Sequence, residues 1–107
     1  MKREFLKSFY IAGFTYYEGA YVFPELKIGD KLKLNCDKKN KHDDFAVEIN
    51  YKNNKLGFIP QNENREIFKL LVMGYDIFEC VVQQLAPENH PAEQVRVGIF
   101  IIDKNKK

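Results

Sequence analysis

A pair of adjacent tyrosines and a run of lysines are the residues in this chain best suited to bind a ligand. Tyr16 and Tyr17 lie between Gly13 and Gly19, outside strictly alternating positions, so a turn can display their rings. Residues 27–41 contain six lysines against two aspartates, a local charge of +4. Lysines that follow phosphates and rings that stack on bases are how proteins hold single-stranded nucleic acid. The candidate phosphate contacts are Lys31, Lys33, Lys38 and Lys39.

The same residues have an alternative interpretation that involves no ligand. A lysine face turned toward solvent and two half-buried tyrosines are ordinary features of a protein surface. The formal net charge is only +2, from 17 Lys and Arg against 15 Asp and Glu. A total so close to zero argues against a broad duplex-binding surface and is compatible with a few contacts to one strand end.

Motifs for catalysis or metal binding are much weaker. The chain has one serine, Ser8, and one threonine, Thr15, and no motif sets a general base beside either. No glycine-rich phosphate-binding loop precedes the helical segment described below. The soft metal ligands, which lack the close spacing of a zinc site, are Cys36, Cys80, His42 and His90. We therefore expect a protein that is not an enzyme and uses no metal or cofactor.

The cysteines and the lengths of the apolar runs bear on where the protein works. Cys36 and Cys80 are too few for a disulfide framework, which favours free, largely buried thiols in a reducing cytoplasm. No run approaches the ~18–20 apolar residues of a membrane span, and no small-residue cleavage site follows the N-terminus. These features predict a cytoplasmic protein with no membrane partner and no signal peptide.

The elements that must position these residues are mainly strands, because apolar residues recur with a period of two. The expected strands cover about residues 6–14, 31–36, 45–51, 55–59, 75–85 and 95–102. Loops are expected over 19–24, 37–44 and 86–93. Asn53-Asn54 is expected to form a tight hairpin turn, since asparagine tolerates a positive φ.

One segment has helical periodicity. Its apolar residues at i, i+3 and i+4 spacing are Ile67, Leu70 and Leu71. Asn62 or Asn64 can cap the start of this helix, and Gly74 can end it.

About six strands and one helix predict a mostly β, α+β fold, built as a small closed barrel or a rolled sheet. Hydrophobic residues make up 45% of the chain and charged residues 30%, which is typical of a folded domain. The length of 107 residues predicts a single domain over 1–107, with a core over about 5–102 and a tail at 103–107.

Three segments of the chain resemble the sequence motifs of the HIRAN domain family. Residues 11–19, IAGFTYYEG, are similar to an opening motif in which a Val-Ala-Gly strand runs into a Tyr-Tyr turn. Residues 40–47, NKHDDFAV, resemble a second motif with an asparagine, an aromatic residue and an aspartate before Asn-Ala-Val. Residues 56–61, LGFIPQ, resemble a third, Leu-Gly-Tyr-Ile-Pro-Arg, and Asn64 opens the helix after it. Order and spacing both match, and the resemblance covers about residues 5–102.

The resemblance implies a six-stranded barrel related to oligonucleotide-binding (OB) folds, with one or two helices. HIRAN domains occur at the N-termini of fork-remodelling DNA translocases, where they capture the 3′ end of single-stranded DNA, and as free-standing bacterial proteins. By this resemblance we expect a non-catalytic domain that binds a 3′-OH end of single-stranded DNA in DNA repair or replication-fork processing. A DNA-processing protein is a candidate partner.

The resemblance also implies roles for individual residues. Tyr16 and Tyr17 would stack on or flank the last bases, and Asp43 would accept a hydrogen bond from the terminal 3′-hydroxyl. An ionised carboxylate only accepts hydrogen bonds, so Asp43 would favour a free 3′-hydroxyl over a 3′-phosphate or a continuing strand. The alternative is that Asp43 bonds amides of its own loop. The other site residues that the matching positions suggest are Thr15, Asn40, Lys41, His42, Phe58 and Gln61.

The chain departs from its DNA-binding relatives at four positions. Thr15 stands where they carry an arginine before the tyrosine pair, and Gln61 replaces a residue that is often basic. Phe45 replaces an asparagine, and His42 replaces a tyrosine. Each missing cation that would have touched a phosphate lowers the slope of log affinity against log salt by about one. The lysines that could compensate from the loop are Lys38, Lys39 and Lys41.

These departures leave an alternative function open. A protein-interaction module could keep the same barrel and lose the DNA pocket, and the missing cations favour it.

Overall fold

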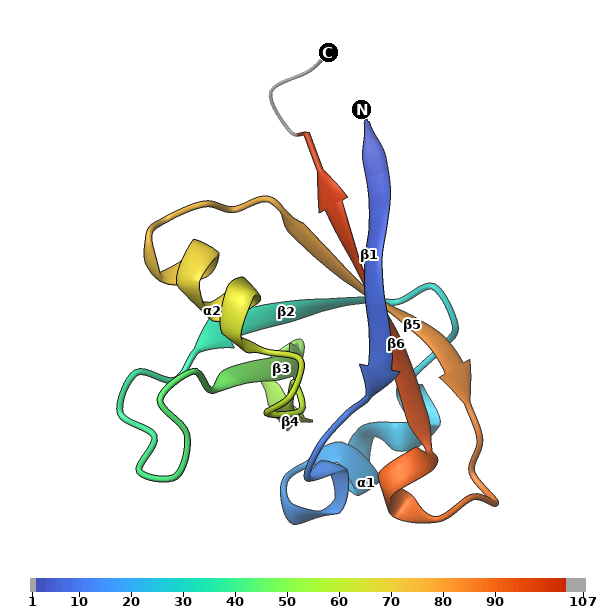
Figure 1. Ribbon diagram of the computed structural model, residues 1–107. Helices are drawn as coiled ribbons and strands as arrows, with labels where there is room; N and C mark the ends of the chain where they lie inside the picture. Colours follow the sequence, from blue (N-terminus) through green and yellow to red (C-terminus); the bar gives the residue numbers. More distant parts are fainter. Residues whose placement is uncertain (1, 104–107) are drawn as a thin grey trace.

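The computed structural model describes residues 2–103, so Met1 and most of the expected tail, 104–107, lie outside the described residues. The strands are β1 (Arg3–Tyr10), β2 (Lys31–Cys36), β3 (Val47–Tyr51), β4 (Asn54–Phe58), β5 (Phe78–Leu85) and β6 (Val95–Ile102) (Figure 1). The α-helices are α1 (Gly19–Val22) and α2 (Arg65–Val72). Single 3₁₀ turns are η1 (Phe14–Tyr16), η2 (Phe23–Glu25) and η3 (Pro91–Glu93).

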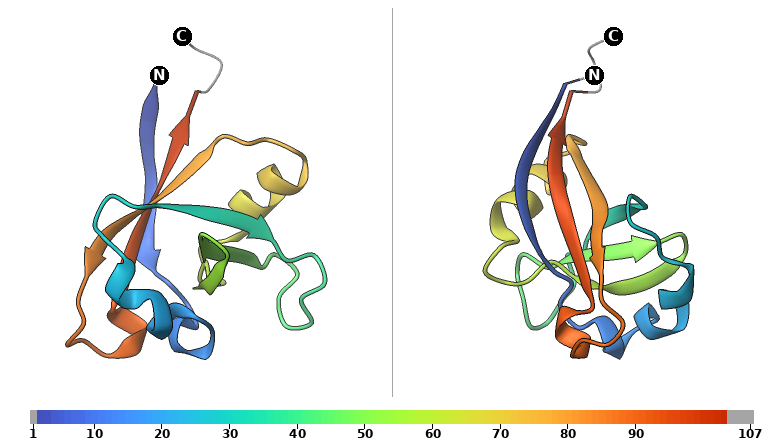
Figure 2. Two further views of the ribbon diagram at one scale, coloured as in Figure 1. Left: turned by 180° about the vertical axis from the view of Figure 1, so that it is seen from behind. Right: turned by 90° about the vertical axis from the view of Figure 1, so that its right-hand side faces the viewer.

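The strands form one antiparallel sheet in the order β1-β6-β5-β2-β3-β4. Two residue pairs, Lys31 with Val81 and Leu32 with Cys80, join β2 to β5, and beyond them β2 crosses the direction of β1 and β6 (Figures 1 and 2). The sheet therefore curls, but it is not closed along its edges. Within residues 2–103, an isolated bridge between Ala12 and Phe58 connects its two ends. The predicted OB-like α+β fold is confirmed, as a curled sheet instead of a fully closed barrel.

The core lies inside this curl. Alternate residues of β3 and β6, such as Val47 and Ile49 or Val97 and Ile99, are completely buried there. Helix α2 packs near β2 and adds Ile67 to the same core. Burying one such side chain contributes about 1.5–3 kcal/mol, so the period-two pattern fixes which strand face points inward.

The first strand differs from the expected 6–14. It covers residues 3–10, and its register shifts between Phe5 and Lys7 where it pairs with β6. The strand cannot continue to 14, because Gly13 takes a left-handed φ of 73° and begins the turn η1. After β1 the chain crosses the open side of the sheet, and Ala12 meets β4 on the far edge.

The turns also differ from the sequence expectation. The hairpin between β3 and β4 turns on Lys52-Asn53 instead of Asn53-Asn54, since Tyr51 pairs with Asn54. Lys52, and not an asparagine, takes the positive φ of 55°. The expected loop over 19–24 holds α1 and the start of η2, and the loop over 86–93 holds η3. Strands β3 and β5 begin two to three residues later than expected, as strand ends often do.

The expected helix is present as α2. Asn64 occupies its N-cap position, and Gly74, with φ 92°, follows its end as expected. The amide of Gly74 donates to the carbonyl of Leu71 at 3.0 Å, which closes the last turn. None of the helices in the described part of the chain is long and apolar enough to cross a membrane.

Candidate functional site

A cavity of about 250 Å³ opens where the turn after β1, the loop after β2 and the end of β4 meet. Its lining residues are Ala12, Gly13, Tyr16, Tyr17, Asn40, His42, Asp43, Ala46, Phe58, Ile59 and Gln61. Seven site residues implied by sequence resemblance are thus brought together from three separate segments: Tyr16, Tyr17, Asn40, His42, Asp43, Phe58 and Gln61.

The tyrosine turn is fastened to β4 at both of its ends. At one end, the amides of Ala12 and Phe58 each donate to the other's carbonyl oxygen at 2.9 Å. At the other, the Glu18 amide donates to the Lys55 carbonyl at 2.9 Å, and the Lys55 amide donates to Glu18 Oε1 at 2.6 Å. These four hydrogen bonds hold Tyr16 and Tyr17 beside β4, although about forty residues separate the two segments in the sequence.

Aromatic rings form one wall of the cavity. Tyr17 and Phe58 meet edge to face with their centroids 5.7 Å apart. Tyr16 is 85% exposed and Tyr17 is 41% exposed, so both rings are available to a ligand. The Nζ of Lys55 lies 4.3 Å from the Tyr17 centroid and 4.4 Å from the Phe58 centroid. The wall therefore consists of two exposed tyrosine rings and the half-buried ring of Phe58, with the ammonium group of Lys55 against Tyr17 and Phe58.

The half-buried carboxylate of Asp43 also lines the cavity. Its Oδ1 accepts from the amide of Phe45 at 2.9 Å, and its Oδ2 accepts from Nδ2 of Asn64 at 2.7 Å. Asp43 therefore does bond an amide of its own loop. Each carboxylate oxygen has two acceptor positions, so these contacts fix the group and leave acceptor capacity for a ligand.

The loop that carries Asp43 is held by a second side chain, Asn40. Its Oδ1 accepts from the amides of His42 at 2.8 Å and Asp43 at 3.0 Å, and its Nδ2 donates to Asp37 at 3.2 Å. Such side-chain bonds to nearby amides are how asparagine shapes turns. A loop without strand pairing thus places Asp43 in a defined position.

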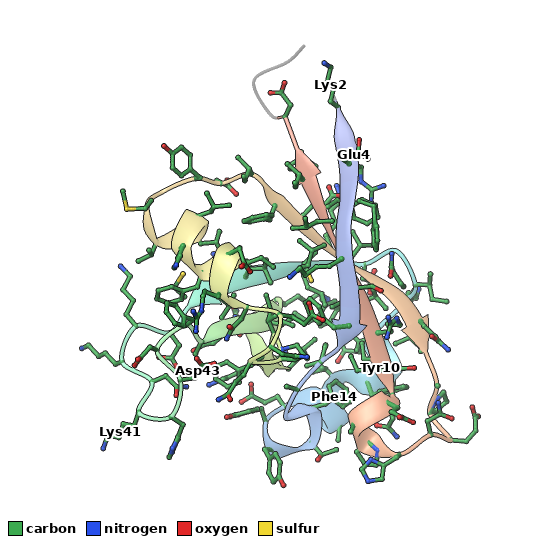
Figure 3. The ribbon with its side chains drawn as sticks, viewed as in Figure 1. Lys2, Glu4, Tyr10, Phe14, Lys41 and Asp43 are labelled. Carbon is green, nitrogen blue, oxygen red and sulfur yellow. The ribbon has the colours of Figure 1, made fainter. Side chains whose placement is uncertain are left out.

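The structure does not bring the predicted lysines into this cavity. Lys31 and Lys33 line a different groove of about 630 Å³, next to the end of α2 and the start of β5, and Lys31 pairs with Glu79 at 3.2 Å. Lys41 lies at the outer end of its loop and points away from the body, whereas Asp43 lies on the inner side (Figure 3). Three more predicted residues, all exposed and outside the lining, are Thr15, Lys38 and Lys39. Among residues 2–103, the cavity lining therefore contains no lysine or arginine.

The sequence did not predict the contacts that two residues near the cavity, Asn64 and Lys55, make with Asp43 and with the aromatic rings. Asn64 is 1% exposed, and its side chain makes no capping bond to α2 but donates to Asp43. Its place before a helical segment suggested a cap, and no local signal points to a partner 21 residues away. The sequence did not indicate the ring contacts of Lys55, because strand alternation shows which face of a sheet a residue occupies and not which side chains it contacts there.

The surroundings of both cysteines and of Ser8 bear on nucleophilic catalysis. Burial raises the pKa of the Cys80 thiol to about 12, and burial also raises the pKa of Cys36, although Lys38 opposes it. Both cysteines are free. The Ser8 hydroxyl accepts a hydrogen bond from Arg96 at 2.9 Å. Within residues 2–103, no group of three or more His, Cys, Asp or Glu side chains is arranged to hold a metal ion.

Comparison with known proteins agrees with this architecture. A protein from Lactobacillus plantarum of known crystal structure superposes with a TM-score of 0.78 at 19% identity, over 94% of this chain and 95% of the other. The HIRAN domain of human HLTF superposes with a TM-score of 0.64 at 16% identity, over 96% of this chain and 83% of the other. Curated protein sequences show no significant match. The family model of the HIRAN domain matches residues 6–102, and the chain therefore belongs to the HIRAN domain family.

Proposed function

We propose that this HIRAN domain is a nucleic-acid-binding module that holds the 3′ end of single-stranded DNA and catalyses no reaction. The observation that carries the proposal is one cavity lined both by the exposed rings of Tyr16 and Tyr17 and by the fixed carboxylate of Asp43. The terminal base stacks on Tyr16 or Tyr17, and the 3′-hydroxyl donates to Asp43. Stacking of a base on an aromatic ring contributes about 1–3 kcal/mol, so two rings supply a useful share of the affinity.

The chemistry of the carboxylate supplies the preference for an end. A hydroxyl can donate to a carboxylate, whereas a 3′-phosphate or the next phosphodiester presents negatively charged oxygens to it. Among residues 2–103, no lysine or arginine lines the cavity, so no lining cation offsets that repulsion. A free 3′-hydroxyl is therefore the favoured ligand, and a strand that continues past this point is disfavoured.

The test compares two oligonucleotides that differ only at their 3′ end. We expect wild-type protein to bind a 5′-labelled oligothymidine with a 3′-hydroxyl about tenfold or more tightly than the same strand with a 3′-phosphate, measured by fluorescence anisotropy. Asp43→Asn removes the charge and is expected to reduce that preference severalfold. Asp44→Asn, at the exposed neighbouring position, is the matched control and should leave the preference unchanged. Equal binding of the two ends by the wild type would contradict end recognition.

A second candidate function is a protein-interaction module on the same fold. The absence of lysine and arginine from the cavity lining in the described part of the chain favours it, because nucleic-acid sites usually neutralise phosphates. If the wild type binds no single-stranded DNA at low salt, this function replaces the first. A DNA-processing protein is the partner that we propose for that case.

The non-catalytic part of the proposal has its own support and test. Raised pKa values keep both thiols in their less reactive protonated form, which opposes a cysteine nucleophile. Turnover of labelled DNA in a nuclease or phosphatase assay with added Mg²⁺ would overturn it. We further propose that the protein acts in DNA repair or replication-fork processing in the reducing cytoplasm, consistent with its free cysteines.

A further inference from the structure

Lys55 is a cation in direct contact with the aromatic wall of the site. Its Nζ lies almost equally far from the ring centroids of Tyr17 and Phe58, at 4.3 and 4.4 Å. Its backbone is tied to Glu18 by two hydrogen bonds, one from each amide. These contacts hold the ammonium group of Lys55 and the tyrosine turn next to each other beside β4.

The ammonium group of Lys55 is also incompletely engaged. Its acidic partner is Glu48, with Nζ and Oε2 3.7 Å apart, longer than the 2.7–2.9 Å of a charge-assisted hydrogen bond. The side chain of Lys55 is 27% exposed, so solvent or a ligand can reach it. An ammonium has three donors, and this one can turn from Glu48 to an incoming anion without leaving the rings.

Lys55 lies outside the cavity lining, so it is placed to contact a phosphate of the bound DNA and not the terminal nucleoside. A cavity of about 250 Å³ lined in part by Asp43 has room for a terminal nucleoside, so the phosphates that precede it lie outside the cavity. Tyr17 and Phe58 line the cavity, and Lys55, which is outside the lining, lies against both rings. Two other cations near the loop are directed elsewhere, since Arg65 lies over Phe45 at 4.7 Å and Lys41 points outward (Figure 3).

We propose that Lys55 is the phosphate-binding cation of this site, with its Nζ donating to a phosphate next to the terminal nucleoside while it stays against Tyr17 and Phe58. It supplies from β4 the positive charge that neither Thr15 nor Gln61 carries. The inference rests on the proposed binding of single-stranded DNA. It adds Lys55 to the binding residues and gives the path of the DNA, which leaves the cavity across β4.

The experiment measures how salt changes the affinity for a 3′-hydroxyl oligothymidine. Affinities of wild type and Lys55→Met are measured by anisotropy between about 50 and 200 mM KCl. The slope of log affinity against log salt is negative, and removal of one phosphate-binding cation from a single-strand site should reduce its magnitude by about 0.7. At the lowest salt, Lys55→Met should bind about tenfold more weakly. It should keep the preference for a 3′-hydroxyl over a 3′-phosphate, since Asp43 is untouched.

Two variants make this result specific to the position of the charge. Lys55→Arg keeps a cation on the rings and should retain the wild-type slope. Lys52→Met removes one charge from the turn of the same hairpin, where Nζ lies 5.1 Å from Tyr51, and should leave slope and affinity nearly unchanged. The role of Lys55 is overturned if Lys55→Met keeps the wild-type salt slope, or if Lys52→Met loses as much affinity and slope as Lys55→Met does. Either result leaves end recognition standing. No binding by wild-type protein overturns the proposed function and this inference together.

Discussion

The carboxylate of Asp43 owes its position to Asn64, a buried polar side chain from a different segment. Asn64 is 1% exposed and donates to Asp43 Oδ2 at 2.7 Å, while Phe45 donates to the other oxygen. A hydrogen bond to a charged group contributes about 1.5–3 kcal/mol, more than a bond between neutral groups. The same contact therefore stabilises the fold and orients a group of the candidate site.

We expect Asn64→Ala to lower the free energy of unfolding by about 1.5–3 kcal/mol, because Asp43 then loses a partner that water cannot easily replace. Urea unfolding followed by circular dichroism measures this change. The double variant with Asp43→Ala should lose less than the sum of the two single variants, as coupled neighbours do.

Asn62→Ala, in the exposed position two residues earlier, is the control and should change stability by less than about 0.5 kcal/mol. An unfolding midpoint of Asn64→Ala equal to that of the wild type would show that the contact with Asp43 contributes no stability.

At the scale of elements, the crossing of residues 11–13 over β4 decides where the tyrosines lie. Gly57 in β4 has φ 151°, and a Cβ there would collide with the carbonyl oxygen of Ala12 and with Cγ2 of Ile11. A glycine is thus required for the two backbones to pair at Ala12 and Phe58. That bridge, together with the bonds between Glu18 and Lys55, places the turn beside the cavity.

Gly57→Ala is expected to lower the free energy of unfolding by about 1–3 kcal/mol through backbone strain alone. The collision of the new Cβ with Ala12 and Ile11 adds to this loss. Single-stranded DNA binding should weaken as well, because the tyrosine turn is displaced. Thermal unfolding and anisotropy measure the two effects.

Gly29→Ala provides the comparison. Gly29 also has a positive φ, of 97°, but a Cβ there meets nothing within 4 Å. It should show a smaller loss of stability and no loss of DNA binding. Equal effects of both substitutions would indicate that strain alone, and not the close approach to Ala12, is responsible.

At the scale of the whole molecule, charge is divided between regions with different roles. Glu79 on β5 receives Arg3 of β1 at 2.8 Å and Lys31 of β2 at 3.2 Å, so one carboxylate links three strands. The hydrogen bond from Arg3 lowers the pKa of Glu79 below its usual value of 4.5, against the effect of burial, and Lys31 lowers it further. Arg3 and Lys31 are therefore engaged within the sheet, and neither lines the cavity.

This arrangement predicts a pH dependence of stability. A carboxyl group with a lowered pKa in the folded state stabilises the protein above its unfolded pKa, and that stability disappears as the pH falls through the folded value. Between pH 7 and about 3, Glu79→Gln should therefore lose less stability than the wild type does. The difference should stay under about 1 kcal/mol, because Arg3 and Lys31 are largely exposed.

Urea unfolding at a series of pH values measures the effect. Glu88→Gln, in an exposed turn, is the control and should follow the wild type. Parallel curves for wild type and Glu79→Gln down to pH 3 would contradict the linkage.

The sequence alone determined most of the strands, helix α2 and the segments that carry the family motifs. Period-two burial and the end of a helix at Gly74 depend on residues close in the chain, so they can be read locally. Where a local signal was ambiguous, as for the turn at Lys52-Asn53 or the end of β1, the prediction was wrong by one to four residues.

The tertiary structure alone decided what meets at the cavity. It placed Asp43 against Asn64, set Lys55 on the rings of Tyr17 and Phe58, and sent Lys31 and Lys33 to another groove. Except for Lys55 and Phe58, which share β4, these contacts join segments about twenty to forty residues apart, and they depend on how far the sheet curls and where residues 11–13 cross β4. Alternation fixes the face of a strand on which a side chain lies, whereas its neighbours across the molecule are set by the packing of the whole chain.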